Sequence, residues 1–387
     1  MAPNPDSPRP LALALGGLGA LAAAVGIGRF VYTPILPLMV EDLGMTKGAA
    51  GLLASANFLG YLAGALLAAT PTVPGSRRSW LLLSLTVSSL TTGTMAFASS
   101  TAAFLILRFA GGVASAFVLV LASALVLDRL SAAGRPDLAA VHFAGVGVGM
   151  ALSAVLVSCL AAWDIGWRSL WLASGLTSVF AVGIVAALIA DRVEPAMTTT
   201  SRPRQANSRL AALVVAYGLF GFGYIITATF LVAIVRGTAQ VRALEPLIWL
   251  VVGLTAAPSV ALWTWVGAKI GVARGFALAC GIEAVGVAAS VLWLTPSGVL
   301  LAAALLGGTF MGITALGLIR ARHLSSGDPR RTLAVMTAAF GLGQIVGPVF
   351  AGVIYDATGT FLVPSLTAVS ALLVGALLAM AGSTQTL

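Results

Sequence analysis

Three side chains that could bind a substrate lie within the first long apolar run, which extends from Leu11 to about Val40: Arg29, Tyr32 and Thr33. The spacing i, i+3, i+4 puts them on one face of a helix. An arginine inside a bilayer costs about 2.5–3.5 kcal/mol on insertion scales, so we expect it to face water, a partner or a substrate. A guanidinium stays charged and offers a planar fork of donors suited to carboxylate or phosphate.

A second arginine, Arg108, lies inside the apolar run 102–128. At 1.5 Å per residue, Arg108 lies roughly 10 Å from the nearer end of its run and Arg29 roughly 12 Å from Pro37. Neither run has an acid near these depths. The two arginines therefore indicate an anion site. The alternative is that each binds backbone carbonyls freed by Gly or Pro, and it is stronger for Arg108.

Further candidates lie in other apolar runs. Four of them would form an aromatic and apolar wall with two phenol donors, or else ordinary helix packing: Tyr217, Tyr224, Thr227 and Met311. Two are amides, Asn57 and Gln344, for which interhelical hydrogen bonding is an equal alternative. Glu283 is the one acid well inside an apolar run and is a candidate for proton coupling, although a structural role is the favoured interpretation.

The composition identifies a polytopic membrane protein. The chain has 387 residues, of which 59% are hydrophobic and 9% charged, against about 25% charged in soluble domains. We predict twelve spans of the roughly 20 residues that a bilayer requires, and we expect the first to be retained because it is too long for a signal peptide. They lie at about 11–40, 48–70, 80–100, 102–128, 139–162, 168–190, 210–235, 246–267, 275–295, 298–321, 333–355 and 361–381.

The distribution of positive charge predicts the orientation. Four of the 21 Lys and Arg lie in one set of connections: Lys47, Arg168, Arg236 and Arg242. Two lie inside spans, and the other fifteen lie in the opposite set, which includes both terminal regions and the segment 191–209. The positive-inside rule then puts both termini and this segment in the cytoplasm of a bacterial inner membrane. The net charge of +9 therefore reflects topology, and we do not expect a nucleic-acid partner.

The two halves of the chain repeat each other. The motif Gly26-Ile-Gly-Arg29 recurs as Gly221-Phe-Gly-Tyr224 at an offset of 195, and two further glycine pairs recur at 196. This is typical of a parallel repeat of six plus six helices. We predict an all-α protein with two pseudo-symmetric six-helix bundles, 1–190 and 210–387, joined by a cytoplasmic linker at 191–209.

Six plus six helices, a basic central segment and cytoplasmic termini resemble the major facilitator superfamily over essentially the whole chain. The first run, Gly26-Ile-Gly-Arg-Phe-Val-Tyr-Thr-Pro-Ile-Leu-Pro37, resembles the helix-1 signature of the YbfB/YjiJ-like bacterial branch. The stretch Leu107-Arg108-Phe-Ala-Gly-Gly112 resembles the intramembrane arginine motif of the superfamily. The resemblance implies that helices 1, 4, 7 and 10 line one central cavity, which both arginines face.

The sequence thus predicts a secondary transporter that moves a small, carboxylate-like organic anion by alternating access. A potential of 100 mV, inside negative, favours exit of a monoanion by about 2.3 kcal/mol. The helices expected to line the cavity have no acid, so export or exchange is favoured over import. Alternatives are a proton-coupled transporter of a neutral sugar or drug-like compound, and a non-transporting membrane sensor.

Other classes of protein lack support in the sequence. No metal-ligand spacing, phosphate-binding loop or nucleophile–base pair occurs, and Cys159 and Cys280 lie in separate apolar runs. We therefore predict no enzyme activity, no metal and no cofactor. The expected partners are the small-molecule substrate and the lipid bilayer, and we expect a monomer.

Overall fold

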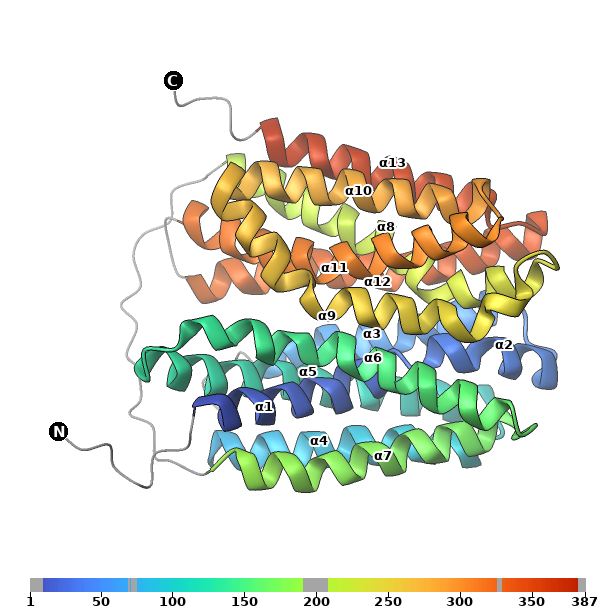
Figure 1. Ribbon diagram of the computed structural model, residues 1–387, viewed down its shortest axis with the longest axis horizontal. Helices are drawn as coiled ribbons and strands as arrows, with labels where there is room; N and C mark the ends of the chain where they lie inside the picture. Colours follow the sequence, from blue (N-terminus) through green and yellow to red (C-terminus); the bar gives the residue numbers. More distant parts are fainter. Residues whose placement is uncertain (1–9, 69, 71–74, 191–207, 326–328, 382–387) are drawn as a thin grey trace.

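The computed structural model describes residues 10–68, 70, 75–190, 208–325 and 329–381. Every regular element in these ranges is a helix (Figure 1). Twelve helical segments are long and apolar enough to cross a membrane. The predicted all-α architecture with twelve spans is therefore confirmed, and each predicted span overlaps one of these segments.

The N-terminal half contains six spans, of which the first is broken into three pieces. These helices are α1 (Pro10–Leu21), η1 (Ala22–Ile27), α2 (Tyr32–Leu43), α3 (Lys47–Ala68), α4 (Arg77–Thr94) with η2 (Met95–Phe97), α5 (Thr101–Ala132), η3 (Pro136–Leu138), α6 (Ala139–Ala161) and α7 (Trp167–Leu188). Ser76 and Ser100 cap α4 and α5 by accepting hydrogen bonds from backbone N–H groups three residues on.

The C-terminal half also contains six spans. They are α8 (Ser208–Gly237), η4 (Arg242–Leu244) with α9 (Glu245–Ile270), α10 (Val272–Leu292), α11 (Pro296–Leu324), α12 (Pro329–Thr358) and α13 (Leu362–Ala381). Most of the predicted linker 191–209 lies outside the described residues, and α8 begins at Ser208, slightly before the predicted boundary. In Figure 1 the two halves lie side by side along their length.

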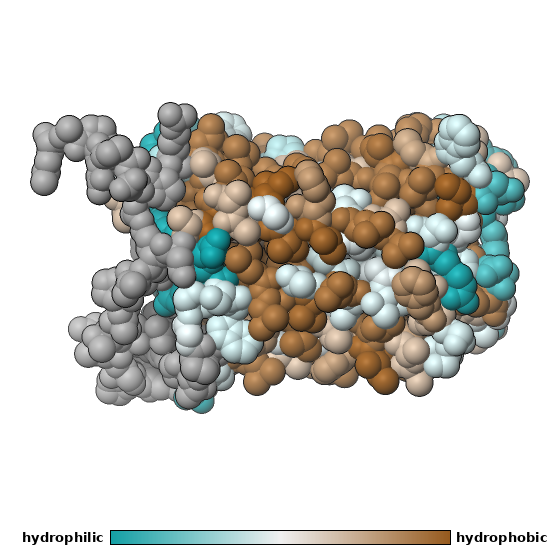
Figure 2. All heavy atoms as spheres, turned by 90° about the horizontal axis from the view of Figure 1, so that it is seen from below, coloured by the Kyte–Doolittle hydropathy of each residue, from teal (hydrophilic) through white to brown (hydrophobic). Residues whose placement is uncertain are grey.

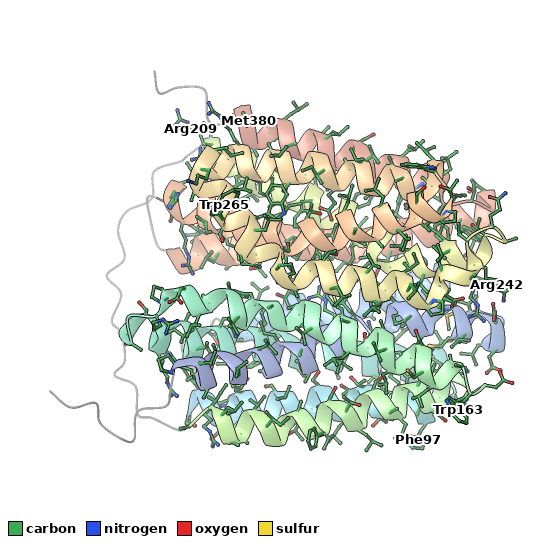
Figure 3. All side chains as sticks on the ribbon, in the orientation of Figure 1. Phe97, Trp163, Arg209, Arg242, Trp265 and Met380 are labelled. Atoms are coloured by element: carbon green, nitrogen blue, oxygen red, sulfur yellow. The ribbon has the colours of Figure 1, made fainter. Side chains whose placement is uncertain are left out.

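The molecule has two distinct ends. We call the end where α1 begins and α13 ends the terminal end, and the other the opposite end (Figure 1). Arg209 and Met380 mark the first, and Trp163 and Arg242 mark the second (Figure 3). Between the ends, the side surface is mostly hydrophobic (Figure 2). Such a surface is suited to contact with lipid tails.

Close helix contacts repeat between the halves. Gly112 of α5 lies against the backbone carbonyl of Asn57 in α3, and Gly307 of α11 lies against that of Val252 in α9. Gly112 and Gly307 are 195 residues apart, and so are their partners Asn57 and Val252. This equals the offset of the first repeated motif in the sequence. A Cβ at either glycine would collide with that backbone. The repeat thus preserves packing contacts as well as helix order.

The first span is interrupted directly before Arg29. Gly26 packs against the backbone of Gly149 in α6, and η1 is a π-helical segment that leads into the turn at 28–31. Pro34 and Pro37 both lie within the regular helix α2. Pro34 occupies the first turn of α2, where a missing N–H is tolerated. The interruption itself precedes α2.

Hydrogen bonds join the halves at the opposite end. The Asp356 carboxylate of α12 accepts from the backbone N–H groups of Lys47 and Gly48 at 2.9 and 2.8 Å. Arg236 of α8 forms a bidentate pair with Glu41 of α2, with donor–acceptor distances of 2.7 and 2.6 Å. In the described part of the chain, α2 and α3 are therefore tied to α8 and α12 on this side.

Candidate functional site

Arg29 lies at the interface between the halves and is only 5% exposed. Its Nη2 donates to Oε1 of Gln344 in α12 at 2.9 Å. The guanidinium carbon lies 4.1 Å from the centre of the Tyr61 ring and 4.6 Å from that of Phe58, both in α3. Aromatic faces at such distances stabilise a desolvated cation. Arg29 Nε has no hydrogen-bond partner.

Gln344 connects Arg29 to the C-terminal half. Its Nε2 donates to the hydroxyl of Tyr224 in α8. The Tyr224 ring is nearly parallel to those of Phe310 and Phe340, with centroids 5.6 and 5.7 Å away. Arg29, Gln344 and Tyr224 thus form a continuous polar chain across the interface, backed by stacked rings. Three residues selected from the sequence are brought together here.

Arg108 binds backbone carbonyls and not a side chain. Its Nη2 donates to the carbonyl of Arg29 at 3.2 Å, and its Nη1 reaches the carbonyl of Gly28 at 3.5 Å. The Arg29 carbonyl is free because the N–H of Thr33 bonds to Phe30 instead. Arg108 therefore satisfies backbone acceptors at the interruption of the first span. This arrangement favours the backbone alternative for Arg108.

Two further candidates on the first span also bind backbone carbonyls. The Tyr32 hydroxyl donates to Ala50 at 2.7 Å, and the Thr33 hydroxyl donates to Ala228 in the other half at 2.8 Å. Both side chains are at most 3% exposed. Thr33 thus contributes to the interface between the halves, while Tyr32 fixes α2 to α3.

Asn57 and Tyr217 likewise make packing hydrogen bonds. Asn57 Nδ2 donates to the carbonyl of Arg108 at 2.8 Å, and Tyr217 donates to the carbonyl of Thr314 at 3.3 Å. The Tyr217 ring also stacks on Phe340, centroid to centroid 5.0 Å. The Asn57 bond favours the alternative that this amide makes an interhelical hydrogen bond. Tyr217 extends the aromatic stack behind Tyr224 toward the terminal end.

Met311, Thr227 and Glu283 do not contact Arg29. Met311 is partly buried and packs against the hydrophobic core, whereas its neighbour Phe310 faces the site and stacks on Tyr224. Thr227 and Glu283 are fully buried, and their side-chain oxygens have no hydrogen-bond partner. The proton-coupling candidate therefore lies inside the C-terminal half.

The aromatic residues around Arg29 were the main omission of the sequence analysis. Phe58, Phe310 and Phe340 all contact the polar chain or its stacked rings. The available signal was the helical spacing of Phe58 and Tyr61 on one predicted span. Aromatic residues are common in every membrane helix, so spacing alone does not separate ring contacts around a cation from lipid-facing packing.

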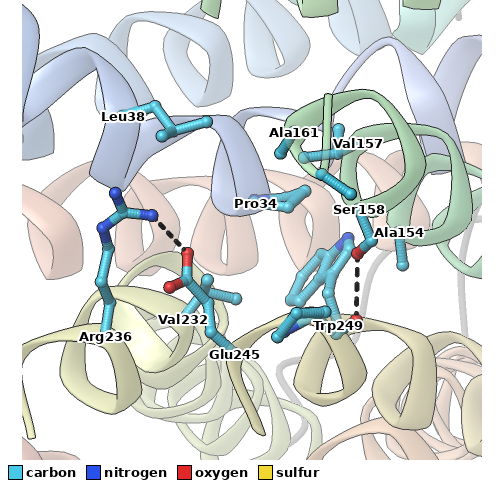
Figure 4. Close-up of a pocket in the computed structure, with 12 residues that line it drawn as sticks. Pro34, Leu38, Ala154, Val157, Ser158, Ala161, Val232, Arg236, Glu245 and Trp249 are labelled. Carbon is cyan, nitrogen blue, oxygen red and sulfur yellow. Dashed lines mark hydrogen bonds and ion pairs between the residues drawn. The ribbon is translucent and has the colours of Figure 1, made fainter. Parts of the chain in front are cut away.

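A cleft of about 260 Å³ lies between α2, α6, α8 and α9, on the opposite-end side of the site (Figure 4). Its walls are mostly apolar and include Pro34 and Trp249, with Arg236 and Glu245 at its rim. Trp249 of this cleft contacts Phe30, the residue next to Arg29, with ring centroids 6.3 Å apart. The halves are thus less tightly packed here than around the polar chain.

The electrostatic character of the site is positive. In the part of the chain that the structure describes, no ion pair is formed by Arg29 or Arg108. The same ranges contain no cluster of three His, Cys, Asp or Glu side chains suited to a metal ion. The chemistry available at the interface is therefore charge and hydrogen-bond recognition, without a nucleophile.

Twelve spans in two repeated halves, with a buried polar chain where the halves meet, define a secondary transporter of the major facilitator type. The chain belongs to the family described as "Uncharacterised MFS-type transporter YbfB", which it matches over residues 21–380. The family and the curated relatives are transporters, so the expectation that the chain is not an enzyme is confirmed.

Two curated relatives resemble parts of the chain. It is 28% identical over 192 residues to a "Gallate transporter" of Pseudomonas putida, a match that covers 49% of this chain and 41% of the relative. It is 30% identical over 181 residues to a "Putative niacin/nicotinamide transporter NiaP" of Bacillus subtilis (strain 168), covering 46% and 44%. The chain thus aligns with less than half the length of each.

The fold resembles solved transporters over nearly the full length. A mutant of the nucleoside transporter NupG superposes with a TM-score of 0.76 at 15% identity and covers 97% of this chain and 100% of that one. At this level of identity, the likeness shows the fold alone.

Proposed function

We propose that this protein transports a small organic anion of the carboxylate class by alternating access, with Arg29 as the group that binds the anionic end. The observation that carries this proposal is the Arg29 guanidinium, which is buried between the halves, contacts the amide of Gln344 and the ring of Tyr61, and has no acidic partner among the described residues. A buried charge is normally paired. A substrate carboxylate would supply the missing counter-charge.

Gln344 indicates where the carboxylate binds. Its Oε1 accepts from Arg29, and a carboxylate oxygen of the substrate would replace this acceptor. The exchange replaces one hydrogen bond to a neutral amide oxygen with a bidentate pair between the guanidinium and a carboxylate, which adds a second hydrogen bond and a counter-charge. The displaced amide remains available to donate to the substrate from the C-terminal half. Contacts from both halves to one ligand are what alternating access requires.

The body of the substrate would contact rings. Tyr61 and Phe58 cover Arg29 from one half, and Tyr224 with Phe310 faces it from the other. The names of the two relatives include gallate and niacin, which are single-ring carboxylic acids, and also nicotinamide, the neutral amide of niacin. They support a single-ring substrate, and two of the three named ligands carry a carboxylate. Stacking on an aromatic ring adds about 0.5–1.5 kcal/mol beyond area burial.

The proposed motion is a rocking of the 1–190 half against the 210–387 half. In the described residues, Asp356 and Arg236 bond the halves at the opposite end. We propose that this end faces the periplasm and that both termini face the cytoplasm, from the charge asymmetry of the connections. Opening toward the periplasm then requires these bonds to break.

The proposed orientation is testable by cysteine labelling. Single cysteines at Thr199, which lies outside the described residues, and at Gln240 would be introduced into a Cys159→Ala background, because Cys159 is exposed. An impermeant thiol reagent should label the Gln240 position in intact cells and leave the Thr199 position unlabelled. The reverse pattern would refute the orientation.

The substrate class is testable on purified protein. A thermal-shift screen should contain aromatic and aliphatic carboxylates, their carboxamides, amino acids, sugars and organophosphates. Carboxylates should stabilise the protein, because a ligand that binds only the folded state raises its stability. Hits should then show saturable counterflow in proteoliposomes. Stabilisation only by neutral or cationic compounds would reject the anion proposal, and binding without flux would favour the sensor alternative.

A further inference from the structure

Three oxygen-bearing side chains in the described part of the C-terminal half are buried without hydrogen-bond partners. The atoms without a partner are both carboxylate oxygens of Glu283 in α10, Oγ1 of Thr227 in α8 and Oγ of Ser365 in α13. Each of these side chains is at most 1% exposed. A buried charge without a partner is among the most costly arrangements in a protein. Glu283 therefore needs a positive charge or a proton from outside the described side chains.

The register of α8 and α10 places Glu283 at the level of Tyr224. The side chains of Tyr217 in α8 and Phe276 in α10 both lie close to the same residue of α11, Gly317. The two helices run in the same direction, and seven residues make about two turns, which returns to the same helix face. Tyr224 and Glu283 are each seven residues further on.

The register of α8 and α13 brings the two hydroxyls together. These helices are antiparallel: Gly375 of α13 packs against Ala216 of α8, and Ala368 packs against Gly223. One further turn along α8 reaches Thr227, and one turn back along α13 reaches Ser365. By register, the three oxygen-bearing side chains therefore lie within about one helical turn of one another along the C-terminal half, at and just beyond the level of Tyr224.

We propose that Glu283, Thr227 and Ser365 form a site for one monovalent cation, a proton or Na⁺, which is carried together with the organic anion. This inference rests on the proposed function. A proton would occupy the Glu283 carboxylate alone. Na⁺ is a hard cation that takes oxygen ligands, and it would also use the two hydroxyls.

Few other charged groups face this site. Of the helices packed around α10, α13 has no ionisable side chain between Leu362 and Ala381. The charged residues of α9 and α11 lie in their end turns. On α10 itself, the neighbouring ionisable group is Cys280, and on α8 it is Tyr224. Glu283 is thus the single carboxylate at this level of the described chain.

The polar chain provides the link between cation and anion. Arg29 reaches Tyr224 through Gln344, and the helix register places Glu283 at the level of Tyr224. An anion bound to Arg29 neutralises the positive charge at the near end of this chain, and cation binding at Glu283 then becomes more favourable. By linkage, the cation strengthens anion binding by the same factor.

This inference revises the basis for the predicted direction. Export or exchange is predicted because the helices expected to line the cavity contain no acid. Glu283 lies on α10, outside those helices, but its proposed site at the level of Tyr224 would supply a coupled cation without an acid on them. A monoanion carried with one cation moves without net charge, and the membrane potential no longer opposes its import.

The cation site is tested first without any anion. Purified full-length protein is melted between pH 5.5 and 8.5 in NaCl, KCl or choline chloride. For a sodium site, Na⁺ at saturating concentration should raise the melting temperature at pH 8 by at least about 2 °C over choline. For a proton site, salts should be equivalent and the melting temperature should rise as pH falls. Insensitivity to both Na⁺ and pH would overturn the proposal.

Variants test whether the response of the melting temperature to Na⁺ or pH arises from these residues. Glu283→Gln, a neutral isostere of the loaded state, should abolish the cation response, while Asp137→Asn, which removes an exposed acid, should keep it. Thr227→Val and Ser365→Ala should weaken a Na⁺ response at least fivefold and leave a proton response intact. A response that survives Glu283→Gln unchanged would overturn the assignment. If that variant does not fold, the two hydroxyl variants and the wild-type salt series still decide the sodium case.

Coupling is tested with nicotinate and gallate as probes. Their affinity for the wild type should rise at least fivefold with the cation identified above, and in Glu283→Gln it should no longer depend on that cation. Anion binding that is independent of pH and Na⁺ would contradict the coupling and leave the proposed function standing. Failure of every organic anion to bind would contradict the proposed function itself.

Discussion

Two buried arginines of the N-terminal half differ in what they bind. Arg108 donates to the carbonyls of Gly28 and Arg29 within its own half. Arg29 donates across the interface to a side chain, Gln344. In both arginines Nε has no hydrogen-bond partner, so this atom does not distinguish them. Both are at most 5% exposed, so burial alone does not separate them. The hydrogen-bond acceptor distinguishes the two arginines, because a backbone carbonyl is fixed and a side-chain amide can be displaced by a ligand.

This difference gives each arginine a distinct task. Arg108 stabilises the interruption in the first span, and that interruption holds Arg29 at the interface. Arg29 presents its charge where both halves meet. We therefore expect substitutions of Arg29 to affect binding before stability, and substitutions of Arg108 to affect stability before binding.

The largest effect is expected from Arg29→Ala. Removal of one partner of a buried charge pair costs about 2–5 kcal/mol, so anion affinity should fall at least thirtyfold, which corresponds to about 2 kcal/mol. The melting temperature of the unliganded protein should change little, because an unpaired cation is also removed. Isothermal titration with nicotinate or gallate measures the first quantity and differential scanning fluorimetry the second.

Arg29→Lys is the matched control for charge. It keeps the positive charge and loses the planar fork, so it should recover part of the affinity. Normal anion affinity in Arg29→Ala would assign Arg29 a structural role and remove the contrast with Arg108.

The second effect is a loss of stability in Arg108→Ala. The carbonyls of Gly28 and Arg29 would lose their donors, at about 1–3 kcal/mol for each unsatisfied group. We expect the melting temperature to fall by at least about 5 °C, while the folded fraction still binds the anion within about fivefold of the wild type. A stable Arg108→Ala protein that has lost all binding would show that Arg108 contacts the substrate directly.

A smaller effect is expected from Tyr224→Phe. The ring stack with Phe310 and Phe340 is kept, and only the hydroxyl that accepts from Gln344 is removed. A typical hydrogen bond contributes about 0.5–1.5 kcal/mol, so anion affinity should fall roughly two- to tenfold. Tyr217→Phe is the control, because the Tyr217 hydroxyl binds a backbone carbonyl away from Arg29. Equal losses in both variants would contradict the special position of Tyr224.

The smallest effect is expected from Glu41→Gln at the opposite end. Glu41 pairs with Arg236 but its side chain is 54% exposed, so solvent screens the pair. Such pairs contribute about 0.2–1 kcal/mol, and the balance between open and closed states of this end should shift by up to about fivefold. Labelling of a cysteine at Val232, which lines the cleft, reports that shift. An unchanged labelling rate would show that the pair does not hold this end closed.

The fold could be predicted almost completely from the sequence because membrane spans are long and uniformly apolar. Span limits, the repeat and the helix order all follow from hydropathy and glycine spacing. The importance of Arg29 could also be predicted, since a charge within such a span is rare. Its partner could not be predicted, because Gln344 is 315 residues away and nothing local distinguishes it from other buried amides.

Glu283 shows most clearly what could not be predicted from the sequence. The family resemblance placed its helix outside the cavity, and this made a structural role the favoured interpretation. The structure buries Glu283 in α10, at the level of Tyr224 in α8, without a hydrogen-bond partner. Sequence patterns assign a residue to a helix face, but they do not show which polar atoms remain unsatisfied after packing.

The central claim is that Arg29 recognises a substrate carboxylate. The most direct measurement compares each carboxylate that binds with its own carboxamide, on the wild type and on Arg29→Gln, by isothermal titration. The pair differs in charge and hardly in shape. The account predicts that the wild type prefers the carboxylate at least thirtyfold and that Arg29→Gln loses this preference. A carboxamide that binds the wild type as tightly as its acid, or a preference that persists in Arg29→Gln, would contradict it.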